Sequence, residues 1–230
     1  MKLIFASPTY GPVDPEALRY QRAAIMHAAN NGCEWMGDAS PDREGYAAAR
    51  NNVVQSIIHN EEYPSDAKIV WLDSDIVLPV DAITRLARSE HDFITGIYYQ
   101  RHEPFWPLVA CYNKERDHFN WLVNWPKNSI FPVDGCGFGI VLTSLKMLRA
   151  MEPPWFDYKK FSEDFSFCLK AKECGFQAYA DSGVLCGHLS NPKAVTIETF
   201  MEAHPDIITS GDGKLCKQFD PNIVGDKENG

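Results

Sequence analysis

The chain has 230 residues and a formal net charge of -9, with 45% hydrophobic and 23% charged residues. This length and balance suit one globular α/β domain, and they exclude a disordered or fibrous chain. The acidic charge argues against extended electrostatic binding of nucleic acid. It does not argue against a nucleotide ligand, because a bound metal ion supplies positive charge locally.

The seven cysteines are scattered along the chain and include no CxxC pair. Zinc sites and disulfide frameworks usually have closer pairs, so we expect reduced thiols that are mostly buried. The N-terminal apolar run, residues 3–6, is too short for the core of a signal peptide, and no stretch approaches the roughly 18 residues of a membrane span. These features predict a cytoplasmic protein without a membrane span, placed in the host cytoplasm if the protein is viral.

The first hundred residues alternate between apolar runs and helical patterns. We expect strands over 3–6, 33–36, 68–72 and 93–99, and helices that begin at Pro15, at about residue 43 and at about residue 79. Asp14 is a typical N-cap, Pro15 suits the first helical position, and Gly32 suits a helix C-terminus. The alternation predicts parallel βαβ units.

The pattern changes between residues 104 and 133, where aromatic residues and prolines favour short antiparallel strands. Helices over 143–151 and 162–174 and a strand over 177–180 are expected to follow. We therefore predict a single α/β domain over 1–205 with a mixed central sheet, and a polar C-terminal tail over 206–230.

The strongest strand pattern, residues 68–72, runs directly into Asp73-Ser74-Asp75. In open α/β sheets ligands bind beyond the carboxyl ends of the strands, and two carboxylates suit Mg²⁺ or Mn²⁺ together with phosphate oxygens. The alternative is an ordinary turn at a strand end, in which the aspartates cap the next helix.

Two later segments carry further candidate residues. His188 lies in Cys-Gly-His-Leu after a late strand, and it is either a metal ligand or a hydrogen-bonded structural residue. Glu163 and Asp164 follow Ser162 at the start of a helix, where acidic residues are favourable in any case. The functional alternative is that one of these carboxylates acts as a general base.

Glycines alternate in Asp134-Gly135-Cys136-Gly137-Phe138-Gly139 before an apolar run. This spacing indicates either a close approach of the backbone to a ligand or a bend, and it lacks the context of a dinucleotide fingerprint. Arg50, in Ala-Arg-Asn, is either a phosphate-binding side chain or an ordinary surface arginine.

Taken in order, these motifs resemble those of GT-A glycosyltransferases, and they are similar to compact family 2-like enzymes that include phage-encoded ones. The resemblance covers about residues 1 to 190 and includes Ser-Pro-Thr-Tyr at residues 7–10. It implies the GT-A fold, a Rossmann-like three-layer α/β/α sandwich with a mixed central sheet. It also implies metal-dependent transfer of a sugar from a nucleotide-diphosphate donor, with UDP the expected nucleotide, to an acceptor hydroxyl.

The resemblance also implies a role for each motif. The metal ion, Mn²⁺ or Mg²⁺, would be bound by Asp73, Asp75 and His188. The nucleotide-sugar donor would be bound by Pro8, Thr9, Tyr10, Asp38, Arg50 and Ser74. The sugar and acceptor side of the site would be lined by Asp134, Gly135, Cys136 and Gly137. Asp164 is the candidate catalytic base, with Glu163 beside it.

Several alternatives stay open at this point. A late metal-binding histidine occurs in several retaining members of the family, whereas the Glu-Asp pair is typical of inverting ones. The acceptor is a glycan, a lipid precursor, a protein or a modified DNA base. The competing functions are a nucleotidyltransferase that makes nucleotide sugars and a non-catalytic module that binds them. The first loop argues against the nucleotidyltransferase, since it lacks the glycine- and arginine-rich character usual in those enzymes. The joint presence of Asp73, Asp75, Asp164 and His188 argues against a non-catalytic module.

Overall fold

The computed structural model describes residues 1–9, 13–40, 44–190, 193–208 and 218–219. Tyr10, predicted to contact the donor, therefore lies outside the described residues. So does Cys216; the six cysteines within the described residues are free thiols.

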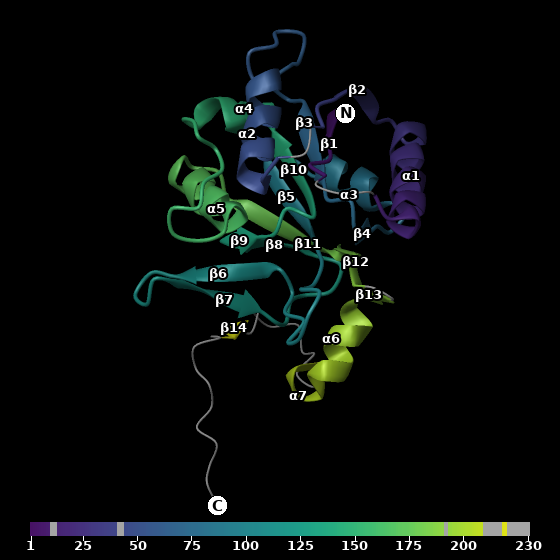
Figure 1. Cartoon of the computed structure of the whole chain (residues 1–230), viewed down its shortest axis with the longest axis vertical. Helices are drawn as coiled ribbons and strands as arrows, with labels where there is room; N and C mark the ends of the chain where they lie inside the picture. The colour runs from purple at the N-terminus through teal and green to yellow at the C-terminus, as the bar shows by residue number, and fades with distance from the viewer. Residues whose placement is uncertain (10–12, 41–43, 191–192, 209–217, 220–230) are drawn as a thin grey trace, which may run out of the picture.

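A seven-stranded mixed sheet forms the centre of the molecule, with strand order β2-β1-β3-β10-β5-β11-β8 (Figure 1). The strands are β1 (Lys2–Ala6), β2 (Glu34–Asp38), β3 (Lys68–Leu72), β5 (Phe93–Ile97), β8 (Ile130–Val133), β10 (Ile140–Ser144) and β11 (Ala178–Leu185). β1 pairs in parallel with β2 and β3, as predicted, and β11 pairs in parallel with β5. β10 lies antiparallel between β3 and β5, and β8 is antiparallel to β11. The predicted mixed central sheet is confirmed.

Helices cover both faces of this sheet (Figure 1). One face carries α1 (Pro15–Asn30) and α3 (Ala82–Arg88), and the other carries α2 (Tyr46–Ile57), α4 (Leu145–Ala150) and α5 (Glu163–Glu173). Successive side chains of β3 alternate between the two cores: Val70 and Leu72 pack with α1 and α3, and Ile69 and Trp71 pack on the other side. Because both faces of the strand are buried, its sequence is a continuous apolar run. The predicted three-layer α/β/α sandwich is confirmed.

Local signals placed several element ends correctly. The Asp14 carboxylate accepts a hydrogen bond from the Glu16 backbone N–H at 2.7 Å, and Gly32 has a φ of 88° just beyond α1. α2 is shorter at both ends than the predicted helix over 43–60. β10 was missed, since its apolar residues follow the glycine-rich segment without a turn signal and lead straight into α4.

Two smaller sheets adjoin the central one. β6 (Val109–Asn113) and β7 (His118–Leu122) form the antiparallel pair expected between 104 and 133, and β9 (Gly135–Cys136) and β14 (Gln218–Phe219) extend it. β4 (Ile76–Val77), β12 (Gly187–Ser190) and β13 (Lys193–Val195) form the other sheet, followed by α6 (Ile197–Ala203) and α7 (Pro205–Ile208). β14 belongs to the predicted tail over 206–230, so that part of the tail pairs with β7; most of the tail lies outside the described residues.

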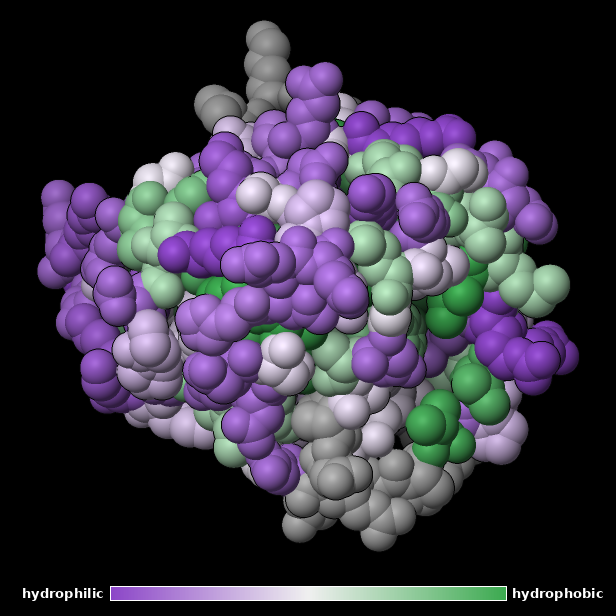
Figure 2. Space-filling view, turned by 90° about the horizontal axis from the view of Figure 1, so that it is seen from above, coloured by the Kyte–Doolittle hydropathy of each residue, from purple (hydrophilic) through white to green (hydrophobic). Residues whose placement is uncertain are grey.

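The surface is mainly hydrophilic when the molecule is seen from above, and its hydrophobic side chains occur in small groups (Figure 2). The exposed large hydrophobic residues include Met26, Val80 and Tyr158, which are far apart in the sequence. Exposed apolar side chains in small groups are normal on a globular surface. Among the described helices, none combines the length and the apolar character needed to cross a membrane.

Candidate active site

The Asp73-Ser74-Asp75 turn begins where β3 ends, and buried polar contacts hold it in place. The backbone N–H of Asp73 donates to the Gly139 carbonyl at 3.0 Å. Gln21 on α1 is 4% exposed, and its amide donates to the carbonyls of Asp73 at 2.9 Å and Ile76 at 3.0 Å. These contacts join the turn to the residue before β10 and to α1. They fix both carboxylates at the carboxyl edge of the central sheet, where ligands bind in α/β folds.

Pairing of β4 with β12 brings His188 to Asp75. His188 lies opposite Ile76 in this pairing, and the Leu189 N–H donates to the Asp75 carbonyl at 2.9 Å. The ring nitrogen Nε2 of His188 is 3.4 Å from Asp75 Oδ2. The other ring nitrogen, Nδ1, lies 2.7 Å from the carbonyl oxygen of Tyr99. A carbonyl oxygen only accepts, so Nδ1 carries the hydrogen, and in the neutral ring Nε2 directs its lone pair toward the carboxylate.

This pair fits a divalent metal ion in part. A ring nitrogen lone pair and a carboxylate oxygen that face each other require a proton or a cation between them, and both groups are ligands of Mn²⁺. A histidine whose other nitrogen donates to a backbone carbonyl is the usual arrangement of a metal ligand. Within the described residues, no three His, Cys, Asp or Glu side chains are grouped to hold an ion. Phosphate oxygens and water would have to complete the coordination shell.

The pKa of the Asp75 carboxyl is lowered from its ordinary value. Burial raises it. The hydrogen bond and charge that the His188 ring supplies when it is protonated, together with the charge of Arg101, outweigh that effect. Asp75 is therefore ionised at neutral pH and remains available to a cation.

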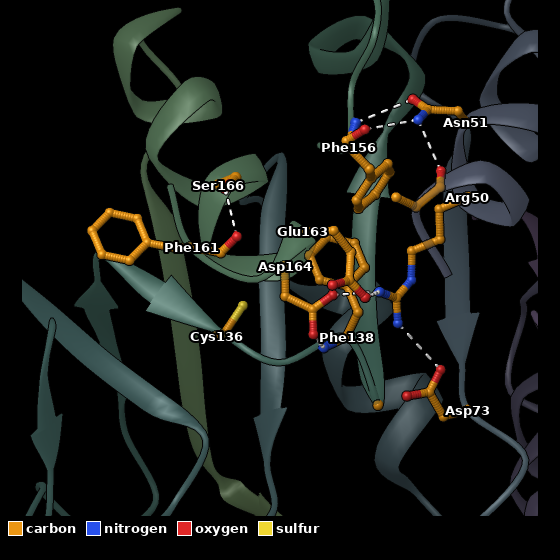
Figure 3. Close-up of polar contacts among 12 residues, drawn as sticks. Arg50, Asn51, Asp73, Cys136, Phe138, Phe156, Phe161, Glu163, Asp164 and Ser166 are labelled. Carbon is orange, nitrogen blue, oxygen red and sulfur yellow. Dashed lines mark hydrogen bonds and ion pairs between the residues drawn. The ribbon is translucent and has the colours of Figure 1, made fainter. Parts of the chain in front are cut away.

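Arg50 on α2 is the centre of a group of three carboxylates, which come from two separate parts of the chain and are at least partly buried (Figure 3). Its side chain is 2% exposed. Nη1 lies 2.8 Å from Glu163 Oε1 and also pairs with Asp164, and Nη2 lies 3.4 Å from Asp73 Oδ1. The ring of Phe138 packs against the guanidinium with its centre 5.1 Å away. This α2 arginine is thus not a solvated surface residue, and carboxylates contact both of its Nη atoms.

One guanidinium cannot neutralise three carboxylates, so excess negative charge remains in this region. Burial raises the pKa of Asp164 to about 7; Arg50 opposes this rise, and Glu163 and Asp73 reinforce it. Burial likewise raises the pKa of Asp73 to about 6, against the opposing effect of Arg50 and with support from Asp75. An arrangement of this kind attracts cations and contains a carboxyl group that titrates near neutral pH.

The start of α5 places Glu163 and Asp164 toward Arg50. Ser162 occupies the N-cap position, but its side chain makes no capping hydrogen bond. The Glu163 side chain is 9% exposed and that of Asp164 is 19% exposed. The backbone N–H of Phe138 donates to Asp164 Oδ2 at 3.3 Å. The favourable position of acidic residues in a first helical turn therefore does not by itself explain Glu163 and Asp164, since both also contact the buried arginine.

A cavity of about 40 Å³ lies at the Asp73-Ser74-Asp75 turn. Its lining residues are Pro8, Tyr46, Asp73, Ser74, Asp75 and Arg101. Two residues predicted to contact the donor, Pro8 and Ser74, are thus beside the predicted metal ligands. Thr9 follows Pro8 and is half-buried. Asp38 ends β2, where its carboxylate accepts a hydrogen bond from the Ser40 N–H at 2.8 Å.

The glycine-rich segment does not line this cavity. Gly135, Cys136 and Gly137 are buried. Aromatic rings pack against the two glycines, in the space that a Cβ atom would need. A Cβ atom on Gly137 would lie 2.1 Å from the hydroxyl of Tyr98. The Asp134 carboxylate accepts a hydrogen bond from the Tyr112 N–H at 2.9 Å and pairs with a lysine of α5. The glycines here serve the close packing of the chain.

Sequence reasoning missed three side chains at this site. Gln21 lies on the buried stripe of α1 with Ala17, Ala24 and Ala28, and a polar residue on such a stripe is a signal that we overlooked. Tyr46 precedes Arg50 by four residues, so the two share one helix face, which is a second usable signal. Arg101 follows a strand in an exposed bend, and nothing local connects it with Asp75.

No protein-family model matches the sequence, and no curated protein matches it. Among solved structures, A197 from STIV is similar over 96% of this chain and 95% of that chain, with a TM-score of 0.56 and 21% identity. A structure of GalNAc-T7 with UDP, GalNAc and Mn2+ is similar over 89% of this chain, with a TM-score of 0.50 and 10% identity. The chain has the GT-A fold.

Identities this low establish the fold alone. This chain spans 47% of the GalNAc-T7 chain, so it corresponds to about half of that protein. The inositol-1-phosphate CTP transferase from T. maritima is similar over 94% of this chain and 98% of that chain, with a TM-score of 0.46 and 13% identity. Within the GT-A fold of this chain, the Asp73-Ser74-Asp75 turn, His188 and the Arg50 group define the candidate active site.

Proposed function

We propose that this protein is a metal-dependent glycosyltransferase that moves a sugar from a UDP-sugar to an acceptor hydroxyl. The observation that carries the proposal is the convergence of two functional halves at the carboxyl edge of the GT-A sheet. Asp75 and His188 form one half, and Asp164 belongs to the other. Asp73 links them, because it is two residues from Asp75 in the turn and contacts Arg50.

The first half would hold the donor. Asp75 and His188 are the side chains that would bind Mn²⁺ or Mg²⁺, and a bound ion would stabilise the negative charge that develops on the diphosphate leaving group. Pro8 and Ser74, at the rim of the turn, would border the nucleotide. The similar structure of GalNAc-T7, which contains UDP and Mn2+, supports the choice of this donor class.

The second half would act on the acceptor. A carboxylate with a pKa of about 7 is suited to accept a proton from a hydroxyl near neutral pH, and Asp164 has this property. Arg50 and the Phe138 N–H hold its two oxygens in place. As the hydroxyl oxygen attacks the anomeric carbon, its proton passes to Asp164 and the bond to the diphosphate breaks. A base so placed suits an inverting reaction, which the anomer of the product would reveal.

Thermal unfolding with a panel of nucleotide sugars, with and without Mn²⁺, tests the proposal. Ligand at about 100 times its Kd should add about 2.7 kcal/mol to the free energy of unfolding. We expect a rise in Tm with UDP-sugars that requires Mn²⁺ and is absent in Asp75→Ala. Asp66→Ala is the matched control, because it removes an exposed aspartate before β3, at the other end of that strand.

Other outcomes would point elsewhere. A rise in Tm with nucleoside triphosphates, accompanied by pyrophosphate release from a triphosphate and a sugar phosphate, would favour a nucleotidyltransferase. Binding of a nucleotide sugar without transfer to glycan, lipid, protein or modified DNA acceptors would favour a binding module. No response to any nucleotide would reject the proposal.

A further inference from the structure

Arg101 stands at the carboxylate that the proposed function assigns to the metal ion. Its Nη1 is 3.2 Å from Asp75 Oδ2, and the same oxygen lies 3.4 Å from His188 Nε2. The Arg101 side chain is 46% exposed. A cationic side chain thus occupies the position beside Asp75 where a metal ion would bind.

The cavity that Arg101 lines is much smaller than a nucleotide diphosphate. This cavity, which Arg101 lines with Asp73, Ser74 and Asp75, measures about 40 Å³. Sites for small-molecule ligands usually measure roughly 300–1,000 Å³, so this one has room for a water molecule or a single ion. A diphosphate could enter this cavity only if a lining group moved. Two large lining side chains are half-exposed, Tyr46 and Arg101, and of these Arg101 is the flexible, charged one. An ion pair this exposed contributes little to stability.

We propose that Arg101 is an exchangeable counter-ion, which neutralises Asp75 in the free protein and binds the donor diphosphate in the complex. The inference rests on the proposed function and deepens it by naming a residue that recognises the diphosphate. On donor binding, the guanidinium leaves Asp75 and pairs with phosphate oxygens, for which its planar arrangement of donors is well suited. Its positive charge then lies beside the leaving group.

This exchange predicts opposite effects of Arg101 on two ligands. Without nucleotide, Arg101 and the metal ion compete for one carboxylate oxygen, so Arg101 weakens metal binding. With nucleotide present, Arg101 contacts the phosphates, so it strengthens nucleotide binding. If Arg101 had a purely structural role, its replacement would distort the site and lower the affinity for both ligands. Changes of affinity in opposite directions would therefore not occur.

Calorimetric titration of the full-length protein tests this prediction. MnCl2 alone is titrated first, and then UDP at saturating Mn²⁺. For Arg101→Ala we expect Mn²⁺ to bind about two- to fivefold more tightly, the range for removal of an exposed ion pair. We expect UDP to bind about tenfold more weakly or worse, the effect of losing a hydrogen bond to a charged group. Arg101→Lys keeps the charge and should lie between wild type and Arg101→Ala in both titrations.

Two controls separate local from general effects. His102→Ala changes the exposed neighbouring residue, and Arg22→Ala removes an exposed arginine from α1; both should bind as wild type does. Weaker Mn²⁺ binding in Arg101→Ala, or unchanged affinities for both ligands, would overturn the exchange while the proposed function stands. Failure of the wild-type protein to bind either Mn²⁺ or UDP would reject the proposed function, and the role of Arg101 with it.

Discussion

The two aspartates of the Asp73-Ser74-Asp75 turn each face an arginine, but the two arginines differ in their surroundings. Arg50 is 2% exposed and packs beneath the site with Phe138, whereas Arg101 is 46% exposed at its rim. The nitrogen–oxygen separations are similar, 3.4 Å for Asp73 and 3.2 Å for Asp75. Distance alone therefore does not distinguish a fixed ion pair from an exchangeable one.

Burial makes the difference. A buried arginine cannot leave its carboxylates without leaving their charges unpaired in a medium of low dielectric constant, so it serves as a permanent part of the site. An exposed arginine can exchange its carboxylate for water, and its position is open to competition from another cation. The four predictions below test this contrast, from the largest expected effect to the smallest.

Replacement of the buried arginine should cost the most stability. Arg50→Ala leaves Asp73, Glu163 and Asp164 without their shared partner, and we expect a loss of about 3–5 kcal/mol in the free energy of unfolding. Arg101→Ala is the matched control and should cost no more than about 1 kcal/mol. Urea denaturation followed by circular dichroism measures both. Equal losses in the two variants would show that burial does not separate the two arginines.

Removal of the candidate base should abolish transfer and spare donor binding. Asp164→Asn keeps the size of the side chain but cannot accept the proton, so we expect a loss of about 10²–10⁴-fold in kcat with little change in donor affinity. Glu163→Gln is the comparison, because Glu163 also contacts Arg50 but is less exposed. We expect a smaller loss there. A transfer rate in Asp164→Asn equal to that of wild type would exclude Asp164 as the base.

Loss of the histidine should weaken the metal site at the rim without disturbing the buried arginine. Loss of a residue that supports a metal ligand typically lowers metal affinity about 10- to 100-fold. Because His188 would be a ligand itself, we expect His188→Ala to lower Mn²⁺ affinity by at least this factor. His27→Ala removes a hydrogen-bonded imidazole on α1 and serves as the control. Electron paramagnetic resonance of free Mn²⁺ reports both affinities. Identical titrations of His188→Ala and wild type would contradict the role of the Asp75–His188 pair.

The acidic group around Arg50 should also make stability depend on pH. The pKa of Asp164 is about 7 in the folded protein, against an ordinary value of 3.8, so the folded state holds this proton more tightly than the unfolded state does. The resulting stabilisation is complete below pH 3.8 and is lost as the pH rises through about 7, by at most about 1.4 kcal/mol per pH unit.

Asp164→Asn has no such proton, so its stability relative to wild type should increase from pH 5 to pH 8. Denaturation at both pH values measures this difference, and a constant difference would contradict the raised pKa. The transfer activity of the wild type should increase with pH over the range in which its stability decreases. It should fall as the pH drops below about 7, because the protonated carboxyl cannot act as a base.

Much of the candidate site could be inferred from the order of short motifs. An apolar strand that ends in two aspartates places them at the edge of a sheet whatever the rest of the fold is, because the carboxyl end of a strand is a local property. The partner of each aspartate could not be inferred. Glu163 and Asp164 are 113 and 114 residues from Arg50, and no local pattern encodes that contact.

The sequence by itself determined the alternation of strands and helices, the α/β class and the position of the Asp73-Ser74-Asp75 turn, since periodicity and caps act over a few residues. Only the tertiary structure decided which arginine is buried, how β4 and β12 bring His188 to Asp75, and where Arg101 lies. Burial and charge pairing depend on groups that are distant along the chain. The pKa of about 7 at Asp164 is therefore a property of the folded protein, and not of the Ser-Glu-Asp-Phe motif that contains it.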